Sequence, residues 1–268
     1  MKAIISGLLL FFCILFSYTE DIIKTTDKLE YEGKYRDALN ILREHFNSMS
    51  PDIKICWRIA RAAFLVSEET NEKSRKMELF EEGINATKPF FNITDADKRD
   101  RAELIHWYAV NYASRIKSLG IFGGKESLNI VPEIFKLMDK CLAIDPAYAG
   151  AYLFKAKLQA EVPFFLGGDK FEMANNYALA LKYAEKEKMV ILADAAKALA
   201  KRNWDVTKKA HKADRLKSEN YAFNKLDDMV YSYNLLIEAK KIYENKQNPA
   251  EQEKILYKEI LKLLEEYK

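Results

Sequence analysis

The stretch V-P-F-F-L-G-G-D-K, residues 162–170, comes closest in this chain to a site for phosphate chemistry. A phosphate-binding loop joins a strand to a helix through G-x-x-x-x-G-K-[ST], so that backbone amides and the helix N-terminus converge on the anion. Here the glycine pair follows a helical pattern, and no hydroxyl residue follows Lys170. Asp169 also places a negative charge where the phosphate would lie. We therefore interpret the stretch as a corner between helices, with Asp169 as the N-cap of the second helix.

Other catalytic and metal-binding patterns are missing from the sequence. The three histidines, His45, His106 and His211, are far apart, and no H-E-x-x-H or Cys-x-x-Cys spacing occurs. There is no G-x-S-x-G motif, and carboxylates scattered over helices are typical of solvated faces. The sequence predicts no metal site, no cofactor and no enzymatic activity.

Aromatic and cationic side chains at helical spacing are the candidate binding residues. Trp57, Trp107 and Tyr152 each lie near the start of a helix, and we expect them to fill the space between paired helices. Residues one, five and eight positions later would then face the concave side of a repeat array. This set includes Arg58, Tyr108, Tyr112, Arg115, Leu153, Lys157 and Ala160. Such a groove would suit an anionic or aromatic ligand, or an extended peptide with a carboxylate end, unless the set merely coats an ordinary surface or fills a core.

The composition predicts that helices position these residues. Of 268 residues only 9 are glycine and 6 proline, while Ala, Leu, Lys and Glu dominate. Apolar residues recur at spacings of three and four, and no alternating strand pattern persists. We expect about 12 helices, with Asp95 as the N-cap of the fifth. The expected ranges are 21–32, 35–48, 52–68, 72–88, 97–119, 127–143, 147–161, 170–184, 188–202, 205–216, 220–245 and 250–267.

An internal repeat indicates how the helices are arranged. Ala38, Leu42 and His45 fall on one helical face, and the same 4-3 spacing recurs at residues 80, 84 and 87 and at 134, 138 and 141. This is the tetratricopeptide (TPR) pattern, in which a small residue lets two helices cross closely and each hairpin buries its open face on the next. We expect an all-α, TPR-like antiparallel array of helix hairpins, with a repeat domain over 20–249 and a capping helix over 250–268.

The first residues resemble an export signal. Lys2 precedes an apolar run over residues 3–16, which is too short to span a bilayer but fits the apolar region of a signal peptide. We assign 1–19 to that peptide and expect an exported, periplasmic protein. Cys13 raises the alternative of a lipid anchor, although Phe12 stands where a small residue normally precedes a lipidated cysteine.

The distribution of charge argues against a nucleic-acid partner, and the positions of the cysteines argue against a disulfide. With 43 basic and 40 acidic residues mixed along the chain, no basic stripe favours nucleic acid. Cys56 and Cys141 lie inside separate apolar helical stretches, so we interpret them as buried small hydrophobic residues and not as a disulfide.

Residues 101–245 resemble a particular family. H-W-Y-A-V-N-Y-A, the run from V-P-E-I-F to D-P-A-Y-A-G-A-Y, and V-P-F-F-L-G-G-D-K are similar to the T-component (TatT-like) proteins associated with TRAP transporters. The resemblance implies a helical TPR bundle without catalysis, possible oligomerisation, and docking to a periplasmic solute-binding protein or transporter subunit during uptake of a small organic or hydrophobic ligand. The middle of the chain also resembles the broader TPR group that includes regulators of microtubule dynamics, but the signal peptide argues against a cytoskeletal role.

Two functions therefore remain open at this stage. The first is an exported scaffold that docks a partner protein, either the solute-binding protein above or, as a general adaptor, a peptide. The second is a helical protein that holds a small hydrophobic ligand in a pore through the bundle.

Overall fold

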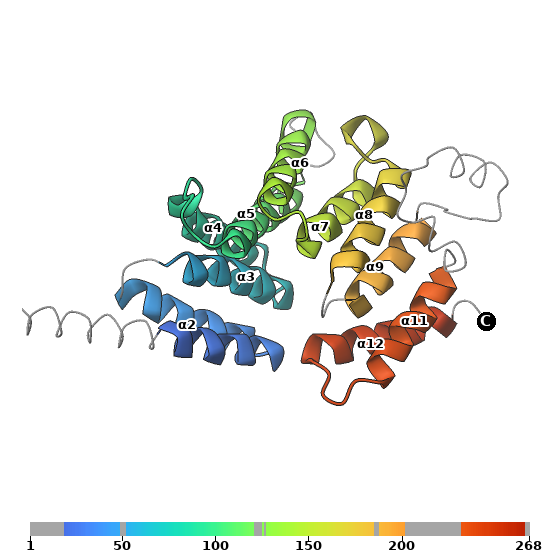
Figure 1. Cartoon of the computed structure of the whole chain (residues 1–268), viewed down its shortest axis with the longest axis horizontal. Helices are drawn as coiled ribbons and strands as arrows, with labels where there is room; N and C mark the ends of the chain where they lie inside the picture. The colour runs from blue at the N-terminus through green and yellow to red at the C-terminus, as the bar shows by residue number, and fades with distance from the viewer. Residues whose placement is uncertain are drawn as a thin grey trace, which may run out of the picture.

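The protein is an array of packed helices (Figure 1). The structure, a computed structural model, describes residues 19–48, 52–120, 125, 127–184, 188–201 and 232–265, and these ranges contain no strand. The elements are a helix over 19–31, α2 (Tyr35–Ser48), α3 (Ile53–Glu69), α4 (Lys73–Thr87), η1 (Lys88–Phe90), α5 (Lys98–Ser118), α6 (Ser127–Ile144), α7 (Ala149–Glu161), η3 (Phe164–Leu166), α8 (Lys170–Tyr183), α9 (Lys188–Lys201), α11 (Ser232–Glu244) and α12 (Glu251–Glu265). The predicted all-α array is confirmed. The helix expected over 205–216 and the first half of the one expected over 220–245 lie outside the described residues.

Local capping fixes several helix boundaries. The Asp52 carboxylate accepts a hydrogen bond from the Lys54 amide at 2.7 Å and starts α3. Asp97 does the same for α5 by accepting from the Arg99 amide at 2.7 Å, so the prediction of Asp95 as this N-cap was wrong. An aspartate acts as an N-cap only where its own backbone is extended and the next residue begins the helix. Asp97 directly precedes α5, whereas Asp95 lies two residues too early.

The helices pack in antiparallel succession and form two layers. Neighbours such as α3 and α4, α4 and α5, and α7 and α8 make the main contacts, as expected for short connections. In addition α3, α5, α7 and α9 contact one another in series. We call these four, together with the helix over 19–31, the inner helices. Alanines buried on them allow close approach, including Ala60, Ala63, Ala109, Ala151 and Ala156.

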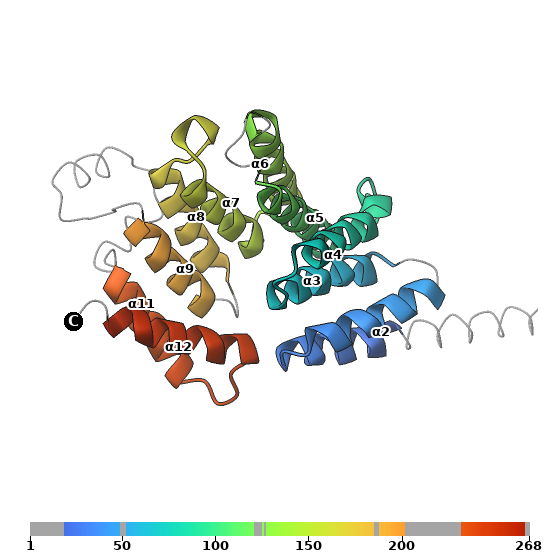
Figure 2. The same cartoon turned by 180° about the vertical axis from the view of Figure 1, so that it is seen from behind.

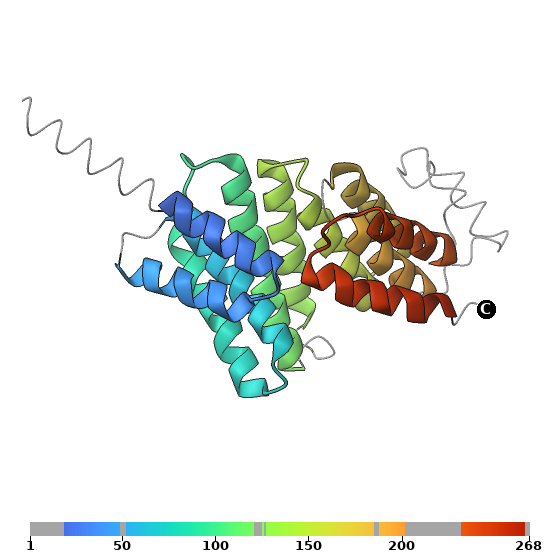
Figure 3. The same ribbon diagram turned by 90° about the horizontal axis from the view of Figure 1, so that it is seen from below.

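The two ends of the array meet. The Tyr31 hydroxyl donates a hydrogen bond to the backbone carbonyl of Asn248. Gly33, at φ 77°, lies so close to α12 that a Cβ added there would be 3.0 Å from the Cβ of Glu251. Views from behind and from below show the first and last hairpins side by side (Figures 2 and 3). The array therefore closes on itself.

The stretch over 162–170 is a corner, as predicted. The amides of Gly167, Gly168 and Asp169 donate to Phe164, Pro163 and Gly167 carbonyls within the corner, so they are not directed at a ligand. A Cβ on Gly168 would lie 1.8 Å from the carbonyl oxygen of Val162, which explains the glycine there. Asp169 accepts from the Glu172 amide at 3.0 Å, which confirms it as the cap of α8.

Candidate ligand-binding cavity

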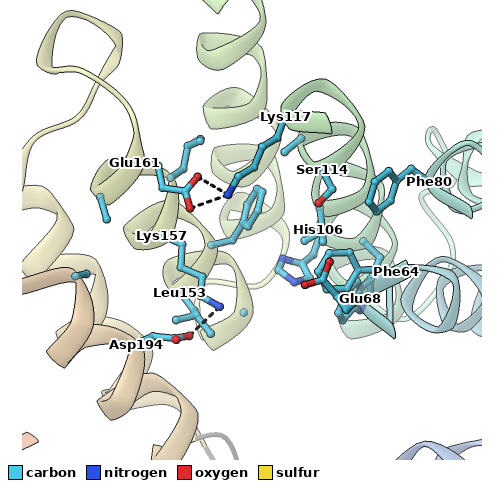
Figure 4. A pocket seen from close by; sticks show the side chains of 18 of the residues that line it. Phe64, Glu68, Phe80, His106, Ser114, Lys117, Leu153, Lys157, Glu161 and Asp194 are labelled. Carbon is cyan, nitrogen blue, oxygen red and sulfur yellow. Dashed lines mark hydrogen bonds and ion pairs between the residues drawn. The ribbon is translucent and has the colours of Figure 1, made fainter. Parts of the chain in front are cut away.

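A cavity of about 710 Å³ lies along the inner helices between α5 and α7 (Figure 4). α3 and α4 border it on one side, and α8 and α9 on the other. Its lining combines an apolar wall with a set of charged side chains. The lining residues are Phe64, Glu68, Lys76, Phe80, His106, Trp107, Val110, Ala113, Ser114, Lys117, Ser118, Gly150, Leu153, Phe154, Lys157, Leu158, Ala160, Glu161, Tyr177, Asp194, Lys197 and Ala198.

Aromatic rings build the apolar wall. The rings of Phe64 and Trp107 have centroids 5.9 Å apart, and the His106 ring lies edge-on to Trp107 at 5.0 Å and to Phe154 at 5.9 Å. These distances are typical of favourable aromatic pairs. The side chains of the wall therefore support one another through direct contacts.

His106 is a neutral member of this wall. Burial, together with the nearby charges of Lys157 and Arg99, lowers the pKa of His106 to about 3. Its Nδ1 atom is buried without a hydrogen-bond partner. At neutral pH the ring therefore adds polarisable surface to the cavity and no charge.

Four lysines line the cavity, each from a different helix, and three of them are paired. Their ion pairs join one helix to the next around the array. The pairs are Lys117 with Glu161 at 2.9 Å, Lys157 with Asp194 at 2.8 Å, and Lys197 with Glu259 at 3.0 Å, while Lys197 also lies 3.6 Å from Asp194. Lys76 forms no ion pair with any residue that the structure describes. The cavity thus carries a small excess of positive charge.

The structure brings only part of the predicted binding set to this cavity. Lys157 lines it, as do Leu153 and Ala160 from the same helix. Arg58, Tyr108, Tyr112 and Arg115 are not among the lining residues. Whether any of the set contacts a partner stays a prediction.

The four side chains outside the cavity are engaged elsewhere. Arg58 stacks 4.0 Å above the Trp57 ring and donates two hydrogen bonds to Asp27. The Tyr108 ring lies edge-on to Phe91 at 4.7 Å. The remaining two contact acids on neighbouring helices: Tyr112 donates to Glu133 at 3.3 Å, and Arg115 pairs with Glu81 at 2.9 Å.

Tyr108, Tyr112 and Arg115 lie outside the cavity because the predicted cavity face of α5 is rotated about the helix axis from the observed face. The prediction assumes that Trp107 and Tyr152 are equivalent, but Trp107 itself lines the cavity and Tyr152 stacks on Tyr183. One residue turns a helix by roughly 100°. The cavity face of α5 is therefore built from residues 106, 107, 110, 113, 114, 117 and 118.

Sequence reasoning found Lys157 but missed Lys117 and Lys197, although a signal was present. Lys117, Lys157 and Lys197 recur at a spacing of 40 residues, close to the length of one hairpin repeat. Charged residues at the repeat period mark equivalent positions, so this spacing could have predicted which face of each helix lines the cavity.

Other predicted features can be placed as well. Cys56 and Cys141 are free and buried, so their interpretation as small hydrophobic residues is confirmed. The described residues contain no group of His, Cys, Asp or Glu that could hold a metal ion. Within the same part of the chain, no helix combines the length and the apolar character needed to cross a membrane. The predicted signal peptide and Cys13 fall almost entirely in residues 1–18, outside the described residues.

Fold and cavity together define an all-helical protein that closes around an internal cavity. The family model described as "Regulator of microtubule dynamics protein 1-3" matches residues 22–163, more than half of the chain. The chain belongs to this family. A comparison with curated proteins found no match.

This finding corrects the resemblance drawn from the sequence. Assignment to the T-component family of TRAP transporters, and to a TPR family, was wrong, because the matching model belongs to neither. The residues that carried the resemblance explain the error. Pro163, Gly167 and Gly168 shape a corner, and Tyr148 and Ala151 pack between helices. Unrelated helical arrays meet the same packing demands with the same residue types.

Proposed function

We propose that the protein is a non-catalytic binding protein whose central cavity holds an elongated small molecule with an apolar body and an anionic end. The cavity of about 710 Å³ carries this proposal, because it lies within the size range of ligand pockets and is lined mainly by apolar and aromatic side chains. We also keep export through an N-terminal signal peptide as a proposal.

The charged side chains that line the cavity favour a ligand with an anionic end. Lys76 and Lys117 lie on the antiparallel helices α4 and α5, near the start of one and the end of the other. Only Lys117 has a carboxylate partner, Glu161, and both side chains of that pair are largely exposed. A carboxylate or phosphate placed here would gain charge-assisted hydrogen bonds at little cost in desolvation.

The polar groups of the cavity support a binding role over catalysis. Ser114 and Ser118 line it, but they lie eight and twelve residues along α5 from His106. At 1.5 Å per residue that is roughly 12 Å or more, too far for His106 to activate either hydroxyl.

Binding of dodecanoate, measured by titration calorimetry and native mass spectrometry, tests this proposal. Ser114→Trp places an indole in the cavity and should weaken binding at least about 100-fold, because the apolar body loses its space. Ser74→Trp, at an exposed position of α4 outside the cavity, is the matched control and should bind like wild type. The proposal fails if wild type binds no dodecanoate at millimolar concentration, or if both variants bind it equally.

Docking of a partner protein is a second candidate, and the corner over 162–169 favours it. Phe164 and Phe165 are 78% and 74% exposed, the largest exposures among large apolar side chains in the described residues. Adjacent exposed aromatic residues on a rigid corner are typical of interface anchors. Because the family description names microtubule dynamics, microtubules are one partner to test.

Co-sedimentation with assembled microtubules tests this second candidate. Wild type should sediment with the polymer, and the double variant Phe164→Ser/Phe165→Ser should remain in the supernatant. Ile255→Ser, at another exposed apolar position, serves as the control. If wild type does not sediment, microtubules are excluded as the partner of this surface.

A further inference from the structure

A second, smaller pocket lies at the N-terminal end of α5, apart from the central cavity. It has a volume of about 180 Å³ and is enclosed by the loop over residues 90–94, the start of α5 and the end of α6. We call it the loop pocket, and we propose that it binds a small organic anion, a carboxylate or phosphate attached to a compact apolar group. No residue lines both the loop pocket and the central cavity, so binding here does not depend on the proposed function.

Two cations of the loop pocket lack an acidic partner. Arg101 and Lys140 both line it, and within the described residues neither forms an ion pair. Arg101 donates from Nη1 to the Thr94 carbonyl at 3.3 Å, and its Nε is buried without a partner. Lys140 donates to the Phe91 carbonyl at 3.4 Å. Both hydrogen bonds are long for a charged donor, so they compensate the two charges poorly.

The acids directly beside the two cations in the sequence are engaged elsewhere. Asp139, next to Lys140, pairs with Lys155 at 2.7 Å. Asp97 caps α5, and Asp100 accepts a hydrogen bond from the Trp57 indole at 3.0 Å. The protein therefore brings two cations to one small hollow whose lining residues include no acid. Both hydrogen bonds are exposed to solvent, so an external anion can reach the two cations and pair with them.

The apolar floor of the loop pocket indicates which chemical group the anion is attached to. Leu104 and Ile105 are buried beneath it, and the Phe91 ring lies 4.8 Å from the Lys140 ammonium. Apolar and aromatic walls favour a carbon skeleton over a bare hydrated ion. The volume is well below that of pockets for drug-sized ligands, so one ring or a short branched chain would fill it.

Titration of the full-length protein with benzoate, phenyl phosphate and inorganic phosphate tests the proposal. At least one organic anion should bind at low ionic strength, and more tightly than inorganic phosphate. Preference for benzoate identifies a carboxylate ligand, and preference for phenyl phosphate identifies a phosphate ester. Equal binding of inorganic phosphate would overturn the proposal, because the apolar floor would then play no part.

Variants locate the binding. Arg101→Gln and Lys140→Gln should each weaken the preferred probe about tenfold or more, through loss of charge-assisted hydrogen bonds. Lys136→Gln is the matched control: it removes the same charge one turn earlier on α6, at an exposed position outside the pocket. Its effect should stay below about twofold, since long-range attraction between exposed charges is screened.

A conservative variant separates recognition from folding. Arg101→Lys keeps the charge but loses the planar fork, so it should bind more weakly than wild type and more tightly than Arg101→Gln. Thermal unfolding without ligand should be similar for all four variants and wild type. The proposal is overturned if no probe binds wild type at millimolar concentration, or if the pocket variants bind like Lys136→Gln.

Discussion

The central cavity and the loop pocket both present cations to solvent, but they treat them in opposite ways. In the cavity, Lys117, Lys157 and Lys197 each meet a carboxylate on another helix. In the loop pocket, Arg101 and Lys140 meet only backbone carbonyls. The difference shows that positive charge serves two purposes here: three of the four cavity lysines join helices, whereas both cations of the loop pocket remain available, as Lys76 does in the cavity.

Placement in the fold accounts for this difference. The cavity lysines lie where one helix faces another, so an acid at the matching height on the neighbour completes the pair. The loop pocket is bounded by a turn, residues 91–94, that carries no acid. An anionic ligand that approaches Lys117 or Lys157 in the cavity must therefore compete with Glu161 or Asp194, whereas one of the loop pocket competes with no carboxylate of the described residues.

The largest expected effect concerns His106, a cavity residue that is neutral at pH 7 and carries a positive charge only when protonated. His106 has a folded pKa of about 3 against an ordinary value of 6.5, so between these values the unfolded chain binds the extra proton. Stability from this group is complete above pH 6.5 and is lost as pH falls toward 3. Between pH 7 and 4.5 the loss should reach about 2.5 kcal/mol.

Urea unfolding at the two pH values measures this loss. His106→Phe keeps an aromatic ring and cannot titrate, so its stability should fall less than that of wild type over the same interval. If wild type and variant show the same pH dependence, the histidine is not buried as described, and protonation can bring positive charge into the cavity without unfolding it.

A second experiment would make the cavity resemble the loop pocket. Asp194→Asn removes the carboxylate that Lys157 and Lys197 share, which leaves Lys157 without an acidic partner while Lys197 keeps Glu259, so the affinity for dodecanoate should rise about fivefold. Stability should fall by about 1 kcal/mol, since Asp194 is mostly buried but Lys157 is half exposed. Asp139→Asn, which breaks the Lys155 pair outside the cavity, should leave dodecanoate affinity unchanged. Calorimetry and urea unfolding measure the two changes, and lower affinity in Asp194→Asn would refute the competition.

The smallest effect is expected at the rim. Lys117 and Glu161 are 61% and 45% exposed, so a double-mutant cycle with Lys117→Gln and Glu161→Gln should give a coupling below about 0.5 kcal/mol in unfolding free energy. The coupling should vanish in high salt. A coupling above about 1 kcal/mol that resists salt would instead show that this pair holds α5 to α7.

Helix positions were largely predictable from the sequence. The expected range over 35–48 matches α2, and the expected ranges over 127–143 and 188–202 each end within one residue of α6 and α9. Apolar periodicity and few glycines and prolines suffice for this, because they report local burial. The cap of α5 was misplaced by two residues, since Asp95 and Asp97 are equally good caps until the loop before them is folded.

The cavity was less predictable, because it depends on how each helix is rotated against its neighbours. On α7 the predicted face was correct and includes Lys157, yet the same rule applied to α5 selected Tyr108 and Tyr112 and missed Trp107. Aromatic residues fill space on either face of a helix, so they are poor indicators of which face lines the cavity. The loop pocket could not be predicted either, because Arg101 and Lys140 are 39 positions apart and meet only in the folded protein.

The contact between the turn at Gly33 and Glu251 limits how this architecture can change. An open solenoid can gain or lose a hairpin at little cost, because the repeats beyond simply shift along the axis. In this protein the summed rotation of all hairpins must bring Tyr31 back to Asn248. An added or deleted hairpin would leave a mismatch at that junction. We therefore expect variation in this fold to accumulate within the loops and the cavity lining, while the number of hairpins stays fixed.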